Sequence, residues 1–234
     1  MKVLVIGDCH LKPHIYERAA ELMRSGVADV AVSLMDIPDD WRKQFSLDEY
    51  EKAFDAVIAF AKEFPDSLFC YGNHDLCYMW NERESGYSPM ARYTVCDKID
   101  ELKGALTNEI RYIQKIDNVL FCHGGLCTYF VLKTIPGEKR GNMDEVVEEI
   151  NRMGHFDLWC DDSPIWYRPQ DYAGSLFMID EYMQVVGHTP VEKPECVNNV
   201  LSCDLFSTYM DGEPIGTEEY VIVDTKTRTF TTVK

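Results

Sequence analysis

The stretch VLVIGDCH, residues 3–10, indicates how this chain folds. Four apolar residues run from Val3 to Ile6 without a polar break, a pattern typical of a strand buried on both faces of a sheet. Gly7 ends the run, and Asp8 and His10 follow at once. Because open α/β sheets build their sites just beyond the carboxyl ends of the strands, this stretch predicts both a buried strand and a site at its end.

The segments that follow repeat this pattern. A strand, a helix and a second strand over 3–6, 15–25 and 29–34 imply a parallel crossover and therefore an α/β fold. Ser46 and Glu49 form a capping-box pattern before a helix over 47–64. The remaining predicted elements are a strand over 67–71, a helix, a loop and a helix within 76–103, strands over 110–114 and 119–122, a helix over 143–153, and strands over 184–186, 197–201, 220–223 and 229–233. With no repeat or linker in between, residues 1–234 are predicted to form a single domain.

Three further segments combine glycine with metal-binding residue types: GNHD at 72–75, CHGG at 122–125 and GHTP at 187–190. Asp8 and His10 can reach one cation from a single turn, and Asp36, after the second strand, can bridge two cations through its two oxygens. The second ion would be completed by Asn73, His123 and His188. Mixed carboxylate, amide and imidazole ligands suit Mn, Fe, Zn or Ni better than Ca. The sequence therefore predicts a site for two divalent metal ions.

His74 is the imidazole in these segments that the ions do not need. Two metal ions about 3.5–4 Å apart activate a water and hold a phosphoryl group for in-line displacement. His74 lies next to Asn73 and is predicted to protonate the leaving oxygen as the general acid. The next residue, Asp75, is predicted to fix the tautomer of His74, and Asp39 is interpreted as a residue that orients a ligand or His74.

In these motifs the chain resembles the calcineurin-like metallophosphoesterase superfamily, nearest the branch of serine/threonine protein phosphatases and symmetrical dinucleoside tetraphosphate hydrolases. That pattern of GDxH, GDxxD, GNH[DE], a His-Gly pair and a late GH is represented here by GDCH, MDIPD, GNHD, HGG and GHT, within residues 3 to 204. Thr189-Pro190 follow His188 where many other branches carry a second histidine, which favours the phosphatase-like branch. The resemblance implies a four-layer α/β sandwich of two mixed central β-sheets flanked by helices.

The resemblance also identifies a substrate-binding residue and two departures. Arg168 lies 20 residues before His188, where that branch often carries a phosphate-binding arginine, and a guanidinium fork suits phosphoryl oxygens. Met35 replaces the usual glycine and is expected to crowd the turn that presents Asp36. Asp40 replaces a second phosphate-binding arginine, for which Arg42 is close enough in sequence to substitute.

The function implied by the resemblance is dimetal-dependent hydrolysis of phosphate monoesters, serine/threonine phosphatase-like, by in-line attack of a metal-bridging hydroxide. The expected substrate is a phosphorylated small molecule or a phosphoprotein. Two alternatives stay open: a dinucleoside polyphosphate hydrolase, and a non-catalytic phosphate-ligand- or partner-binding protein of the same fold that has lost turnover through Met35 and Asp40.

The composition limits the partners and the compartment. With 23 Lys+Arg against 40 Asp+Glu, the formal net charge is -17, which disfavours binding to nucleic acid or anionic membrane. The nine cysteines include no CxxC pair, so reduced thiols are expected. No apolar run approaches the roughly 20 residues of a membrane span, and no secretory signal is recognised. A cytoplasmic protein is predicted.

Overall fold

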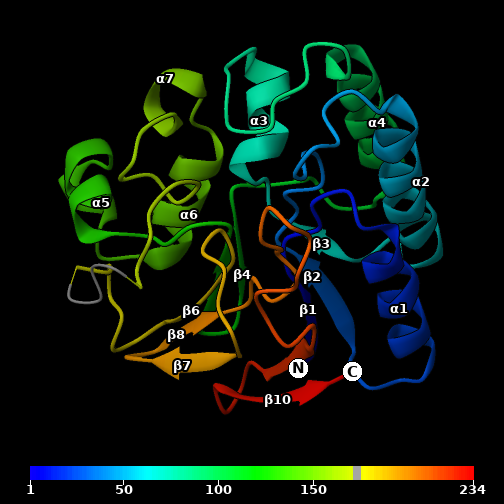
Figure 1. Ribbon diagram of the computed structural model, residues 1–234. Coiled ribbons are helices and arrows are strands. Elements are labelled where there is room, and N and C mark those ends of the chain that lie inside the picture. Colours follow the sequence, from blue (N-terminus) through cyan, green and yellow to red (C-terminus); the bar gives the residue numbers. More distant parts are fainter. Residues whose placement is uncertain (171–174) are drawn as a thin grey trace.

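The computed structural model describes residues 1–170 and 175–234 of the chain. In these residues two mixed five-stranded sheets lie at the centre and helices lie outside them (Figure 1). The predicted α/β architecture of two mixed sheets flanked by helices is therefore confirmed. None of the helices in these residues combines the length and apolar character needed to cross a bilayer.

The first sheet has the strand order β10-β9-β1-β2-β3. β1 (Lys2–Ile6), β2 (Val30–Ser33) and β3 (Leu68–Phe69) run parallel, while β9 (Tyr220–Asp224) and β10 (Thr229–Val233) form an antiparallel hairpin beside β1. Val3 to Ile6 are all buried, as their unbroken apolar run predicts. The helices α1 (Pro13–Arg24), α2 (Leu47–Glu63) and α4 (Arg92–Ala105) gather on one side of the molecule, next to this sheet (Figure 1).

The second sheet has the order β4-β5-β6-β8-β7. Its central strands β5 (Val119–Cys122), β6 (Met183–Val186) and β8 (Val200–Ser202) are parallel, and the edge strands β4 (Ile113–Ile116) and β7 (Glu195–Val197) are antiparallel to their neighbours. On the opposite side from α1 lie α5 (Thr128–Thr134), α6 (Met143–Asn151) and α7 (His155–Leu158) (Figure 1). A short 3-10 helix spans Gly137–Lys139, and α3 (Asn73–Trp80) begins inside the GNHD segment.

Three local predictions need correction. The strand predicted over 197–201 is a hairpin, because β7 ends at Val197 and β8 begins at Val200. Asn198 and Asn199 between them both have positive φ, 51° and 62°, which is the geometry of a two-residue turn that asparagine tolerates. Ser46 is the residue before α2 as predicted, but its side chain makes no capping hydrogen bond. β4 begins at Ile113 rather than Ile110.

Candidate metal centre and active site

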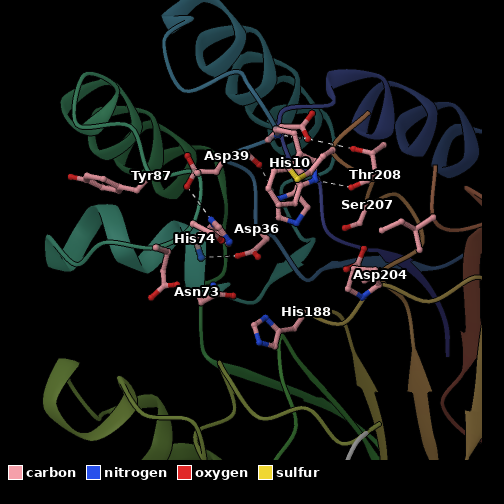
Figure 2. A pocket seen from close by; sticks show the side chains of 18 of the residues that line it. His10, Asp36, Asp39, Asn73, His74, Tyr87, His188, Asp204, Ser207 and Thr208 are labelled. Carbon is pink, nitrogen blue, oxygen red and sulfur yellow. Dashed lines mark hydrogen bonds and ion pairs between the residues drawn. The ribbon is translucent and has the colours of Figure 1, made fainter. Parts of the chain in front are cut away.

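The predicted metal ligands follow five of the parallel strands of the two sheets. Asp8 and His10 follow β1, Asp36 follows β2 and Asn73 follows β3. In the second sheet, His123 follows β5 and His188 follows β6. Figure 2 shows His10, Asp36, Asn73 and His188 grouped around one space. The two sheets therefore bring together all six residues that the sequence predicts as ligands, through two groups that share Asp36.

The first group consists of Asp8, His10 and Asp36, whose ligand atoms all lie within 4.8 Å of one another. Nδ1 of His10 lies 2.9 Å from the carbonyl oxygen of Asp39, so Nδ1 donates and Nε2 is left as the ligand atom. Oδ2 of Asp8 accepts from the backbone N–H of His188 at 2.9 Å. The approach is so close that a Cβ on Gly187 would lie 2.1 Å from Oδ1 of Asp8. Glycine is therefore required where GHTP begins.

The second group places His188 and His123 beside Asp36, with ligand atoms again within 4.8 Å of one another. Nδ1 of His123 lies 3.0 Å from the carbonyl oxygen of Leu34 and donates to it. Its Nε2 lies 3.0 Å from Oδ1 of Asn73 and 3.2 Å from Oδ2 of Asp36. An imidazole nitrogen, an amide oxygen and a carboxylate oxygen thus converge on one point, and the backbone fixes the orientation of the imidazole ring.

The pKa values and the unpartnered buried atoms of these groups favour the binding of cations. Burial would lower the pKa of His123, but Asp36 and Asp8 outweigh it and raise that pKa to about 9. Burial and the neighbouring His123 lower the pKa of His188 to about 2, which keeps His188 in the neutral form that binds metal. Oδ1 of Asp8 and Nε2 of His188 are buried without a hydrogen-bond partner among the described residues.

Such buried, unpartnered polar atoms each cost about 1–3 kcal/mol unless something satisfies them. A divalent cation in each group would satisfy both atoms, and it would replace the proton on His123 as the charge that balances Asp36. The donor set of carboxylate, amide and imidazole is also the one that Mn, Fe, Zn and Ni accept. The residues present therefore fit two divalent metal ions that share Asp36.

The loops that carry the ligands adopt unusual backbone conformations. His10 (φ 44°), Met35 (φ 55°), Asp36 (φ 44°) and His188 (φ 64°) all lie in the left-handed region, which costs a non-glycine residue on the order of 1 kcal/mol or more. Met35, expected to crowd its turn, is fully buried, and its backbone is held by hydrogen bonds with Ser33 Oγ and the N–H of Cys9, both at 3.1 Å. The turn is thus kept, and Asp36 still reaches both groups.

His74 is held by Asp39. Nδ1 of His74 lies 3.0 Å from Oδ2 of Asp39 (Figure 2). The other oxygen of Asp39 accepts from the hydroxyls of Tyr50 at 2.7 Å and Tyr78 at 2.5 Å. Burial would lower the pKa of His74, but Asp36 and Asp39 outweigh it and raise that pKa to about 9. Asp39 therefore contacts the ring of His74, one of the two contacts expected of it, and Nδ1 is the ring nitrogen that Asp39 occupies.

The predicted pairing of His74 with Asp75 is wrong. Asp75 is fully buried and its carboxylate accepts three backbone N–H groups, from Gly72 at 3.0 Å, Asp36 at 2.9 Å and Ile37 at 3.1 Å. Both residues lie in the first turn of α3, where consecutive side chains point in different directions. Asp75 therefore ties the turn of Asp36 to the start of α3 and does not contact the His74 ring.

Arg168 lies at the rim of the second group. Its guanidinium donates to the carbonyl oxygen of His188 at 2.8 Å and to Oγ1 of Thr189 at 3.0 Å. It lines a cavity of about 630 Å³ together with His10, Asp36, Asn73, His74 and His188. Asp40, which replaces the second arginine, is held by Lys43 at 3.0 Å and Lys12 at 3.8 Å. Arg42 also lines the cavity, so both candidate arginines are within it.

Asp204 is a cavity residue that the sequence interpretation missed. It follows the parallel strand β8, has only 1% of its surface exposed, and lines the cavity (Figure 2). Burial raises the pKa of its carboxyl group above the usual value, against the opposing effect of His10. The signal was present, since Asp204 comes just after the buried run VLS, as Asp8 does after its own strand. Trp41, Tyr87 and Trp166 line the cavity as well.

Comparisons with known proteins bear on the fold and the family of the chain. Two of the most similar solved structures are a cold-active protein-tyrosine phosphatase of a psychrophilic Shewanella species (15% identity, TM-score 0.59, covering 100% of this chain and 80% of that chain) and a cold-active protein tyrosine phosphatase solved at 1.1 Å (18% identity, TM-score 0.53, 100% and 78%). At these identities they show a shared fold. No curated protein sequence matches the chain significantly. Residues 1–202 match the calcineurin-like phosphoesterase family, and the chain therefore belongs to that family.

Proposed function

We propose that this chain is a dimetal-dependent phosphoesterase that hydrolyses phosphate monoesters. The observation that carries the proposal is one cavity lined by members of both ligand groups, which share Asp36, and by the His74–Asp39 pair. Asp8, His10 and Asp36 would hold one ion, and Asp36, Asn73, His123 and His188 would hold the other. When bound, two such ions activate a water and neutralise charge on the phosphoryl oxygens.

His74 supplies the proton in this proposal. Its Nδ1 is occupied by Asp39, which two tyrosine hydroxyls hold in place, so the proton on Nε2 is the one available to a leaving oxygen. The carboxylate of Asp39 also stabilises the charged imidazolium that must persist until the bond to phosphorus breaks. A general acid of this kind matters most for an alkoxide, which is a poor leaving group without a proton.

Arg168 is the residue we propose to bind the phosphoryl oxygens. Its contacts to His188 and Thr189 fix the guanidinium at the edge of the cavity, next to the second ligand group. A substrate with a compact phosphate and an organic group fits the 630 Å³ cavity, and the formal charge of -17 disfavours a nucleic acid strand. A phosphorylated small molecule or a phosphoprotein side chain is therefore the proposed substrate.

One observation supports a second candidate. The exposed ring of Trp41 and the rings of Tyr87 and Trp166 line the cavity and offer faces on which a nucleobase can stack. A dinucleoside polyphosphate would use these faces and the same metal centre. The non-catalytic alternative has less support, since Met35 leaves the turn of Asp36 intact and the His74–Asp39 pair serves no purpose in binding alone.

A substrate panel tests the proposal. Protein freed of metal and reloaded with Mn, Fe, Zn or Ni would be assayed with nitrophenyl phosphate, phosphoserine and phosphotyrosine peptides, nucleoside monophosphates and a dinucleoside tetraphosphate. We include phosphotyrosine because structurally similar chains are tyrosine phosphatases. Turnover of monoesters supports the proposal, whereas turnover of the dinucleotide alone favours the second candidate. Phosphate binding without turnover under every metal would identify a binding protein.

A further inference from the structure

One parallel strand is followed by a carboxylate that belongs to neither ligand group. In the described residues, β1, β2 and β3 of one sheet run parallel to one another, and so do β5, β6 and β8 of the other. Each of the first five is followed by a residue of the two ligand groups. The sixth, β8, is followed by Asp204. Its position is therefore equivalent to that of a ligand.

The backbone at Asp204 is clamped beside the first ligand group. The N–H of Cys203 donates to the carbonyl oxygen of Val186 at 2.7 Å, and the carbonyl oxygen of Asp204 accepts from Val191 at 3.0 Å. A Cβ on Gly7, the residue before Asp8, would lie 2.2 Å from the carbonyl oxygen of Cys203. The segment thus sits at the seam where the end of β1 meets the loop after β6, and it cannot move without disturbing both.

The side chain of Asp204 adds a carboxylate to this seam that accepts a hydrogen bond from Ser207 and has one oxygen to spare. Oδ1 of Asp204 is buried and has no hydrogen-bond partner among the described residues, as is true of Oδ1 of Asp8. Both carboxylates are 1% exposed, and Asp204 lines the cavity with His10 and Asp36. Buried charges in proteins are paired or bind metal. The amine of Lys12, which also lines the cavity, lies 3.8 Å from the carboxylate of Asp40.

Without Asp204, the two ligand groups also differ in their number of residues. The second offers four residues, Asp36, Asn73, His123 and His188, while the first offers three, Asp8, His10 and Asp36. Asp204 is not among the residues whose ligand atoms lie within 4.8 Å of one another, so its side chain would have to turn toward the first group. We propose that Asp204 does so and becomes a further ligand of the metal ion in that group, so that each ion has four protein ligands. The proposal rests on the metal centre of the proposed function, but it does not depend on which ester is hydrolysed.

The test is metal binding by Asp204→Asn, with Asp40→Asn as the matched control. Asp40 is another carboxylate of the same cavity, but its partners are lysines. Mn²⁺ titration of metal-free protein, followed by the electron paramagnetic resonance of free Mn²⁺, gives the affinity of each site. We expect Asp204→Asn to weaken one site at least roughly 10-fold and the control to leave both near wild type. Anomalous scattering from Mn-soaked crystals should show the loss beside Asp8 and His10.

Thermal unfolding separates a ligand from a structural residue. Removing the charge of Asp204 relieves its repulsion of Asp8, so the metal-free variant should melt at or above the wild-type Tm, while Mn²⁺ should raise its Tm less. A lower metal-free Tm with unchanged Mn²⁺ affinity would overturn the proposal, as would wild-type protein that binds no metal.

If Asp204→Asn does not fold, Asp204→Ala is measured in the same way, and failure of both to fold also counts against the proposal. Wild-type protein that binds two ions but hydrolyses no phosphate ester would defeat the proposed function alone.

Discussion

The two halves of the metal centre share Asp36 but are built from different chemistry. The half at Asp8 and His10 is rich in carboxylate, and within the part of the chain that the structure describes a buried oxygen of Asp8 has no hydrogen-bond partner. The half at His123 and His188 is rich in imidazole, and hydrogen bonds already aim its side chains at one point. Both halves therefore have an atom that a cation would satisfy, but only in the second half does a histidine, His123, lie against the shared Asp36.

The difference teaches that one bridging residue can serve two kinds of site. In the imidazole-rich half, a proton on His123 takes the part of the missing positive charge, because Asp36 and Asp8 raise the pKa of His123 to about 9 against the effect of burial. In the carboxylate-rich half, the pKa of Asp8 is raised well above its usual value, first by burial and then by Asp204. The two halves should thus respond differently to pH and to substitution.

Substituting the shared residue should have the largest effect. Asp36→Asn removes the charge that both halves use, so we expect both ions to be lost together on dialysis. Turnover should fall roughly 10⁴-fold, because the metal ions supply several kcal/mol of transition-state stabilisation. Metal content per chain and the rate with nitrophenyl phosphate are the measurements. Loss of one ion alone would show that Asp36 belongs to a single half.

His74 should prove independent of both halves. His74→Asn is expected to keep two ions per chain and to lower turnover by roughly 10²–10⁴, the usual contribution of a general acid. The defect should be smallest for nitrophenolate, which leaves without much protonation, and largest for an alkyl phosphate. Equal defects for good and poor leaving groups would remove His74 from the acid role. Asp39→Asn should lower turnover less than His74→Asn does, since the imidazole stays and loses only its charged partner.

Metal affinity should separate the halves by pH. A cation in the imidazole-rich half must displace the proton of His123, whose pKa is raised to about 9 by Asp36 and Asp8 despite burial. Below that pKa, one proton is released per ion, so affinity should rise about tenfold per pH unit and level off above it. In the carboxylate-rich half the group that must lose a proton is Asp8, whose pKa burial and Asp204 raise from a usual value lower than that of histidine, so this half should respond less between pH 6 and about 8. Mn²⁺ titrations over this range measure the affinity of each site. Equal changes in the affinity of both sites with pH would contradict the predicted difference between the halves.

The sequence predicts site residues well where the information is local in the chain and poorly where it depends on contacts between distant residues. Asp8, His10 and Asn73 were predicted because a buried strand, a glycine and a ligand lie consecutively in the chain, and strand order alone then brings them together. The sequence predicted that the adjacent Asp75 fixes the tautomer of His74, and it left open whether Asp39 orients His74 or a ligand, because Asp39 lies 35 residues away. Sequence spacing shows where a strand ends, but the direction of each side chain depends on the packed loops.

Asp204 and the hairpin of β7 and β8 were missed for a related reason. Asp204 has neither a histidine nor a glycine beside it, so only its place after a buried strand could mark it as a site residue. That signal required the boundary of β8, which was obscured by reading 197–201 as one strand. Recognising Asn198-Asn199 as a two-residue turn would have placed β8 correctly and left Asp204 just beyond its end.

Arg168 should give the smallest of these effects, because its guanidinium is tied to the imidazole-rich half and is not a ligand. Arg168→Ala should raise KM and lower turnover for a phosphomonoester, each roughly tenfold, since a charge-assisted hydrogen bond is worth about 1.5–3 kcal/mol. Metal content should stay at two ions.

Arg168→Lys should recover part of the activity, because an ammonium lacks the bidentate geometry. Thr189→Ala is the matched control, as it removes one of the contacts of Arg168 but keeps the guanidinium. Wild-type kinetics in Arg168→Ala together with a large defect in Arg42→Ala would move phosphate binding to the loop after β2, next to the carboxylate-rich half.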